Sequence, residues 1–214
     1  GAAMTQVADS GAATKTYEYA YTVPATGTTG WWTATVTAKE GTENTVSDTG
    51  AGSFNVVLFP SLTIVKSVLT YSDPINGTTG PKVIPGSFML YTVIVTNSGA
   101  GTVDNNTTVI TDPIPANTEL YVGDINGAGT GPVLFTDGAV ASGLSYSFIN
   151  LASAADSVSF SNDGGASYVY TPVPDANLTD VNVTNLKISL TGILSGASGG
   201  NNPSFNLKFR MRVK

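Results

Sequence analysis

Two short loops carry the oxygen-bearing side chains that a hard cation such as Ca²⁺ prefers. One loop contains Asp124 and Asn126, and the other contains Asp175, Asn177 and Asp180. Neither loop has the spacing of an EF-hand, and Asp and Asn are also common turn formers through their own side chains. Two interpretations stay open: a weak calcium site, the one cofactor that the sequence suggests, or loops closed by Asx turns.

Lys66 is the second residue that could do chemistry. The alternation of residues 61–71 predicts a strand that turns Lys66 toward the core, where an unpaired ammonium is costly. Pilin-like sandwiches sometimes join such a lysine to an asparagine through an amide bond, with an acid as proton shuttle. Candidates here are Asn97 or Asn206 for the amide and Asp112 or Glu119 for the acid. The simpler alternatives are a salt bridge or a lysine stem that reaches out to water.

The residue types that are missing exclude most catalytic chemistry. The chain has no Cys and no His, which removes disulfides, thiol nucleophiles, Ser-His-Asp triads and almost every zinc site. No pair of carboxylates has the support that a glycosidase requires. We therefore expect a protein that is not an enzyme.

The charge of the chain argues against two classes of partner. Its nine basic and 15 acidic residues give a net charge of -6, with a pI of about 4.4. Such a chain lacks the basic surface by which proteins bind nucleic acid or anionic lipid. No apolar run reaches the roughly 18 residues that a membrane-spanning helix needs. The expected partners are other copies of the chain or other surface proteins.

The elements that must position these residues are strands. Charged residues make up only 11% of the chain, Gly is frequent, and helix formers are scarce, which is the composition of strands joined by polar turns. The predicted fold class is all-β, an immunoglobulin-like β-sandwich preceded by an incomplete β-sheet unit. Residues 1–14 are predicted to be a flexible leader, residues 15–59 the incomplete Ig-like unit, and residues 60–214 an Ig-like sandwich with long loops.

The incomplete unit is predicted to have three or four strands. The first places four residues on one face by strict alternation: Tyr17, Tyr19, Tyr21 and Val23. A meander of this kind has one apolar face and no second sheet to cover it. The Trp31-Trp32 pair could stack on sugars, but adjacent strand residues point opposite ways, so at least one is expected to pack inside or between domains. We expect the cover to come from upstream sequence, from the following domain or from another subunit.

The larger domain contains three segments with clear strand patterns. Residues 87–97 are apolar on both faces, which predicts a central strand covered on both sides, and residues 157–173 read as a hairpin around an Asn-Asp-Gly-Gly turn. Residues 204–214 alternate throughout, and their polar face carries four of the nine basic residues: Lys208, Arg210, Arg212 and Lys214. This row is either a solvated face that discourages edge-to-edge pairing or a docking surface for the acidic surface of the next subunit.

The domain also resembles a known family. The matching segments include Leu62, Ile64 and Lys66, then residues 91–99, then Val109 to Pro115, and finally residues 161–172 and the closing strand. In these segments the chain is similar to the bacterial Ig-like surface repeat known as domain of unknown function eleven, over about residues 60–214. The resemblance implies a sandwich fold and an extracellular setting, and it implies no activity, because fold does not fix function.

From these features we expect an extracellular, cell-surface structural protein. The first hypothesis is a subunit of a filament or layer in which a strand of one subunit completes a sheet of its neighbour, with Tyr17–Val23 as the donor. The alternative is a set of C-terminal stalk or ligand-binding modules of a large surface adhesin.

Overall fold

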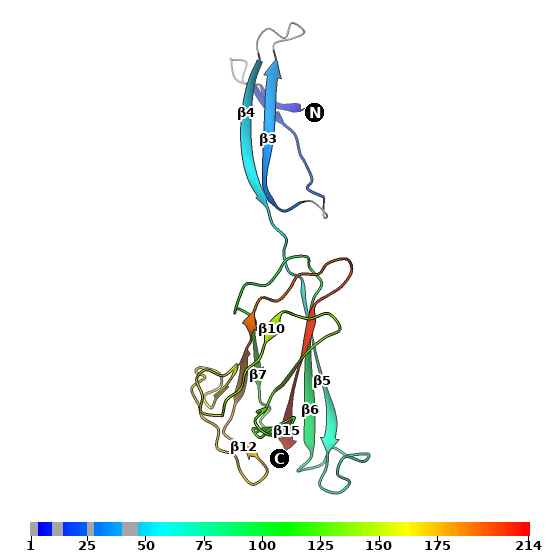
Figure 1. Cartoon of the computed structure of the whole chain (residues 1–214), viewed down its shortest axis with the longest axis vertical. Coiled ribbons are helices and arrows are strands. Elements are labelled where there is room, and N and C mark those ends of the chain that lie inside the picture. Colours follow the sequence, from blue (N-terminus) through cyan, green and yellow to red (C-terminus); the bar gives the residue numbers. More distant parts are fainter. Residues whose placement is uncertain (1–3, 10–14, 25–27, 40–46) are drawn as a thin grey trace. The chain divides into compact units, whose positions relative to one another are not determined.

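The computed structural model describes residues 4–9, 15–24, 28–39 and 47–214, and over these ranges the chain consists of strands and loops without a helix. The predicted all-β class is therefore confirmed (Figure 1). The chain divides into two compact units, Gly1–Val57 (unit 1) and Leu58–Lys214 (unit 2).

Unit 1 consists of two separate two-stranded antiparallel sheets. Strand β1 (Thr5–Asp9) pairs with β2 (Lys15–Glu18), and β3 (Gly30–Lys39) pairs with β4 (Ser47–Val56). This differs from the single meander expected over residues 15–59. Of the leader expected over residues 1–14, residues 1–3 and 10–14 lie outside the described residues, and β1 is a strand because its main chain pairs with β2.

Strand β2 is shorter than the alternation of Tyr17–Val23 predicts. It ends at Glu18, and residues Tyr19–Pro24 continue without strand pairing. Alternation places side chains on two faces, but a strand also needs a neighbouring main chain to pair with. Among the described residues, nothing in unit 1 offers that neighbour to Tyr19–Val23.

Unit 2 has two main antiparallel sheets that enclose one core. The larger sheet has the order β12 (Thr179–Asp180), β8 (Thr118–Tyr121), β15 (Ser204–Val213), β6 (Phe88–Asn97) and β5 (Leu62–Ser72), with β9 (Leu134–Asp137) also paired to β15. The smaller sheet has the order β11 (Val158–Ser161), β13 (Asn185–Ser189) and β7 (Val109–Pro113). A short pair joins β10 (Leu144–Ser145) to β14 (Thr191–Gly192).

The core lies between these two sheets, as expected for a β-sandwich. Four inward residues of β15 are fully buried: Phe205, Leu207, Phe209 and Met211. They belong to one apolar cluster with inward residues of the smaller sheet, among them Phe160, Leu186 and Ile188. Because each sheet hides one face against the other, the alternation of β15 becomes a buried and an outward row.

Two details differ from the sequence-based expectations. Strand β6 is covered on one face only, because Val93 and Val95 are buried while Ile94 on the other face is exposed. The expected hairpin around residues 162–165 is not formed either. Strand β11 pairs with β13, and only a single bridge joins Phe160 to Tyr170.

Candidate assembly site

Strand β5 is an edge strand with one bare side. It pairs with β6 over almost its whole length and, among the described residues, with no other strand (Figure 1). It contains neither Pro nor Gly, and its one irregularity is a register shift between Thr70 and Ser72 at its end. Proteins usually shield such edges with short strands, charges, prolines or bulges, because unpaired N–H and C=O groups invite another strand.

Strand β5 has exposed apolar side chains on both faces. Ile64 and Val68 on the inward face are 59% and 52% exposed, and Val65 and Leu69 on the outward face are 53% and 54% exposed. Single exposed apolar residues are ordinary on protein surfaces. A run of them along the edge of a sheet is typical of an interaction surface.

The inward face of β5 is uncovered because the opposite sheet ends there with another edge strand. Strand β7 pairs only with β13 among the described residues, and its Ile110 and Asp112 lie on the face that points toward the core. One ion pair joins the two edges: Lys66 Nζ lies 2.6 Å from Asp112 Oδ2. The same ammonium lies 4.9 Å from the centre of the Tyr91 ring. Burial, with Asp112 adding to it, raises the pKa of Tyr91.

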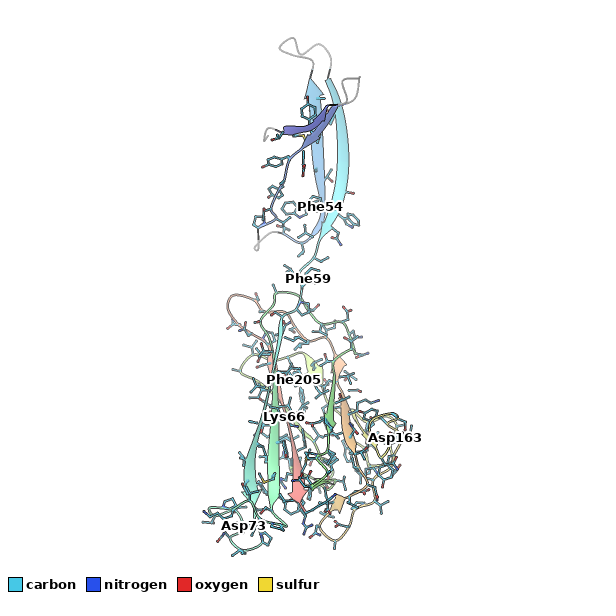
Figure 2. All side chains as sticks on the ribbon, turned by 180° about the vertical axis from the view of Figure 1, so that it is seen from behind. Phe54, Phe59, Lys66, Asp73, Asp163 and Phe205 are labelled. Carbon is cyan, nitrogen blue, oxygen red and sulfur yellow. The ribbon has the colours of Figure 1, made fainter. Side chains whose placement is uncertain are left out.

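This geometry assigns Lys66, which is labelled in Figure 2, to a salt bridge with Asp112 and gives no support to a cross-link with asparagine. The Asn97 amide nitrogen donates to the carbonyls of Gly101 and Ser195, and its oxygen accepts two main-chain N–H groups. Asn206 pairs with Ile94 and therefore faces outward, whereas Lys66 pairs with inward Val93. Glu119, the other candidate acid, is bonded to Thr179 and Arg212.

The basic row lies on the outward face of the same sheet. Arg210 stacks on Tyr71 at the end of β5, 3.8 Å from the ring centre, and donates to the carbonyl of Ile125. Arg212 contacts Glu119 at 3.5 Å, with both side chains partly exposed. Lys208 makes no ion pair with any residue that the structure describes. The row is therefore partly used within unit 2, and Lys208 stays available.

The predicted donor residues lie exposed in unit 1. Tyr17, Tyr19 and Tyr21 are each more than half exposed, and Val23 is half-buried. Tyr21 contacts Trp32 at a ring distance of 6.3 Å, and Trp32 contacts Phe54 on the other side at 6.2 Å.

These aromatic contacts do not make a closed core. Trp31, on the opposite face of β3 from Trp32, is 76% exposed. No residue of unit 1 whose side chain the structure describes is buried. Trp32 therefore takes the packing role expected of one member of the tryptophan pair, and it does so at a surface.

The calcium candidates use their carboxylates within their own loops. Asp124 accepts the N–H groups of Gly129 and Gly131 at 2.9 and 2.7 Å. Asp175 accepts the N–H groups of Thr179 and Asn177, and the first of these bonds is the main reason that its pKa is lowered.

The other members of the set show the same local use. The buried Asp180 carboxylate accepts from the Tyr170 hydroxyl and the Val173 N–H. Asn126 bonds through its main-chain N–H to the Thr130 hydroxyl, and Asn177 donates to Asp175. Within the described ranges no three acidic, His or Cys side chains gather to hold a metal. Asx turns account for both loops, and calcium binding stays a prediction.

Two further aspartates have the same role and were not identified from the sequence. Asp73 follows β5 directly, and the N–H groups of Asn76 and Lys82 hold the pKa of its carboxyl well below the usual range. The hydroxyls of Ser161 and Ser167 lower the pKa of Asp163 in the same way. The signal in the sequence is an Asp that opens a loop rich in Gly or Pro.

Comparison with known proteins gives no relative: no family model, curated protein or solved structure matches the chain. The resemblance of residues 60–214 to an Ig-like surface repeat therefore stays a prediction. Within the described part of the chain, no helix is long and apolar enough to cross a lipid bilayer. The function has to be inferred from the exposed strands.

Proposed function

We propose that the chain is an extracellular structural protein, a subunit of a cell-surface filament or layer in which subunits are joined by β-strand exchange. The observation that carries the proposal is the exposed aromatic surface of unit 1. Its described side chains include three exposed tyrosines, exposed Trp31 and exposed Phe54, and none of them is buried.

Two-stranded sheets with exposed aromatic side chains are not expected to form a stable fold by themselves. A two-stranded sheet is marginal in water by itself, and three or more strands or a packed layer are usually needed. Each buried aromatic side chain contributes about 1.5–3 kcal/mol to stability, a contribution that exposed rings forgo. A strand or sheet from another subunit would supply both the missing main-chain bonds and the cover.

The composition supports a structural role outside the cell. No Lys or Arg occurs between Lys82 and Lys187, so that a trypsin-like protease finds no cleavage site over half of unit 2. Without Cys and His, the chain also lacks the residues most used for nucleophilic and metal-dependent catalysis.

The proposal is tested by comparing the full chain with a variant that lacks residues 1–23. Light scattering and negative-stain electron microscopy should show polymers of the full chain and monomers of the shortened chain. Unit 2 should keep its own melting transition, because its core uses no residue of unit 1. Polymers that form equally well without residues 1–23 would refute strand donation by this segment.

The same measurements address the stalk or ligand-binding alternative. A full chain that stays monomeric at every concentration contradicts a self-assembling subunit and favours modules of a larger adhesin.

A further inference from the structure

We propose that the bare edge of β5 is the acceptor site for the Tyr17–Val23 segment of a second copy of the chain. The inference rests on the proposed function and adds the place where the donated segment binds. It identifies one partner, another copy, and one mode of contact, the extension of the larger sheet of unit 2 by a strand.

The first argument is the main chain of β5. The strand is 11 residues long and, within the described part of the chain, is bonded on one side only, so alternate N–H and C=O groups along the other side have no described strand to pair with. The donor segment has the complementary deficit, since Tyr19–Val23 pairs with none of the strands that the structure describes although its residues alternate. Adding one to the other gives both segments the bonds that each lacks.

The second argument is the match of side chains. The edge of β5 leaves Ile64 and Val68 exposed on its inward face. A strand placed beside β5 with its tyrosines inward would cover these residues, because side chains of paired strands that share a face lie beside one another. Tyr17, Tyr19 and Tyr21 supply large rings at every second position, and each is more than half exposed. Tyr17 pairs with Gln6 of β1, whereas Tyr19 and Tyr21 have no partner strand among the described residues.

The third argument is charge. Unit 1 contains two basic and five acidic residues, hence a net charge of -3: Lys15, Lys39, Asp9, Glu18, Glu40, Glu43 and Asp48. The outward face of the sheet that ends in β5 carries the row Lys208, Arg210 and Arg212, and Arg210 reaches Tyr71 on β5 itself. Opposite charges steer the approach of two such surfaces and weaken with added salt.

The charge of Lys66 is the feature of β5 that could prevent another strand from pairing with it. An inward-pointing charge on an edge strand is one way in which proteins prevent unwanted pairing. Here Asp112 neutralises the ammonium at 2.6 Å, and the ring of Tyr91 lies beneath it. An incoming tyrosine would therefore meet a compensated ion pair, which is a much weaker barrier than a free charge.

Cysteine cross-linking tests the contact cleanly, because the chain has no cysteine of its own. If the tyrosines face inward, Ala20 faces outward, next to the outward residues of β5. Full-length Ala20→Cys would be mixed in urea with one of four full-length variants, refolded and oxidised: Thr63→Cys, Val65→Cys, Ser67→Cys or Leu69→Cys. Ala154→Cys, at an exposed loop position, is the matched control.

The expected result is a mixed disulfide dimer, identified by mass, in at least fivefold higher yield for one β5 position than for the control. Directly opposed strand residues lie within the Cα distance that a disulfide allows, and the four positions cover the possible registers. No β5 position above the control overturns the proposal. A Ser67→Cys variant that cross-links with itself as efficiently also overturns it, because the occupant would then be the β5 edge of another copy.

A blocking variant gives an independent test. Val65→Lys places a charge on the exposed edge and should abolish polymers, whereas Val173→Lys, at an exposed loop position, should leave them unchanged. If the full chain polymerises, the shortened chain does not, and Val65→Lys has no effect, strand donation stands and β5 is not the acceptor. If the full chain never polymerises, the proposed function itself fails.

Discussion

Strands β15 and β5 belong to the same sheet, have nearly equal lengths and alternate apolar residues along one face, yet they differ completely in burial. Four inward residues of β15, from Phe205 to Met211, are fully buried, whereas inward Ile64 and Val68 of β5 are more than half exposed. Strand β15 has partners on both sides, with β6 along one edge and β8 and β9 along the other. Among the described strands, β5 pairs with β6 alone.

The difference shows that alternation determines which side chains of a strand share a face, but it does not determine whether that face is buried by neighbouring elements. A central strand receives neighbours in the sheet and a second layer above it. An edge strand at the open side of the sandwich receives neither, although its own sequence is just as apolar. The strand whose residues form the core of unit 2 and the strand that we propose for assembly are therefore distinguished by their position in the sheet.

The sharpest way to test this comparison is to shorten one inward side chain on each strand. Phe209→Ala removes a fully buried ring and should lower the free energy of unfolding of unit 2 by about 3–5 kcal/mol. Ile64→Ala removes a side chain that is 59% exposed and should cost about 1 kcal/mol or less.

The measurement is urea unfolding followed by circular dichroism. Both tryptophans lie in unit 1, so that tryptophan fluorescence follows that unit separately. Equal losses for the two variants would mean that β5 is as well covered as β15 in solution, which contradicts the comparison. Repeating Ile64→Ala in the assembled protein sharpens it, because a donated strand should make this substitution more costly.

A smaller effect is expected where β5 meets the opposite sheet. Lys66→Met leaves the Asp112 carboxylate, whose side chain is 8% exposed, without its partner and should cost about 2 kcal/mol. Asp112→Asn should cost about 1 kcal/mol or less, because the half-exposed Lys66 can turn to water.

The same urea titration measures both variants. A larger loss for Asp112→Asn than for Lys66→Met would show that the lysine depends on the pair more than the acid does. The ion pair would then lie deeper than the exposure of Lys66 indicates, and the opening between β5 and β7 would be closed.

The sequence predicted the strands of unit 2 well because their pattern is local. The alternation of residues 204–214 and 61–71 corresponds closely to β15 and β5, and it assigns Phe205 and Ile64 to inward faces. Over Tyr17–Val23 the same pattern predicted a longer strand than the one that forms. Over residues 87–97 it predicted burial on both faces of a strand that is buried on one face only. In both cases the deciding factor was a neighbour that is distant in sequence or absent, which local periodicity does not encode.

The candidate site was predicted in parts. The outward row from Lys208 to Arg212, the exposed tyrosines and an acid for Lys66 follow from residue type and strand register. The bare edge of β5 does not, since strand order depends on which distant segments pair. The aspartates at positions 73 and 163 were missed because their acceptors are loop N–H and hydroxyl groups that only the folded loop brings together.

The smallest expected effect is confined to the loop at the end of β5 and depends on pH. The folded loop lowers the pKa of Asp73 below its unfolded value of about 3.9, so that the ionised form stabilises the loop. This stabilisation is fully present above about pH 4 and is lost as the pH falls toward the lowered pKa. The loop should therefore loosen in acid, while β15, whose buried residues do not titrate, should not.

Hydrogen exchange with mass spectrometry, corrected for intrinsic rates, measures this difference between the two strands. Between pH 5 and pH 3, peptides covering residues 73–83 should lose protection, and peptides covering residues 204–213 should keep it. Asp73→Asn should show the loosened loop already at pH 5 and little further change in acid, because its side chain cannot ionise. An equal loss of protection in both sets of peptides would place the acid-sensitive group in the core. The distinction between β15, which is fixed by packing, and β5, whose end is held by a carboxylate, would then not hold.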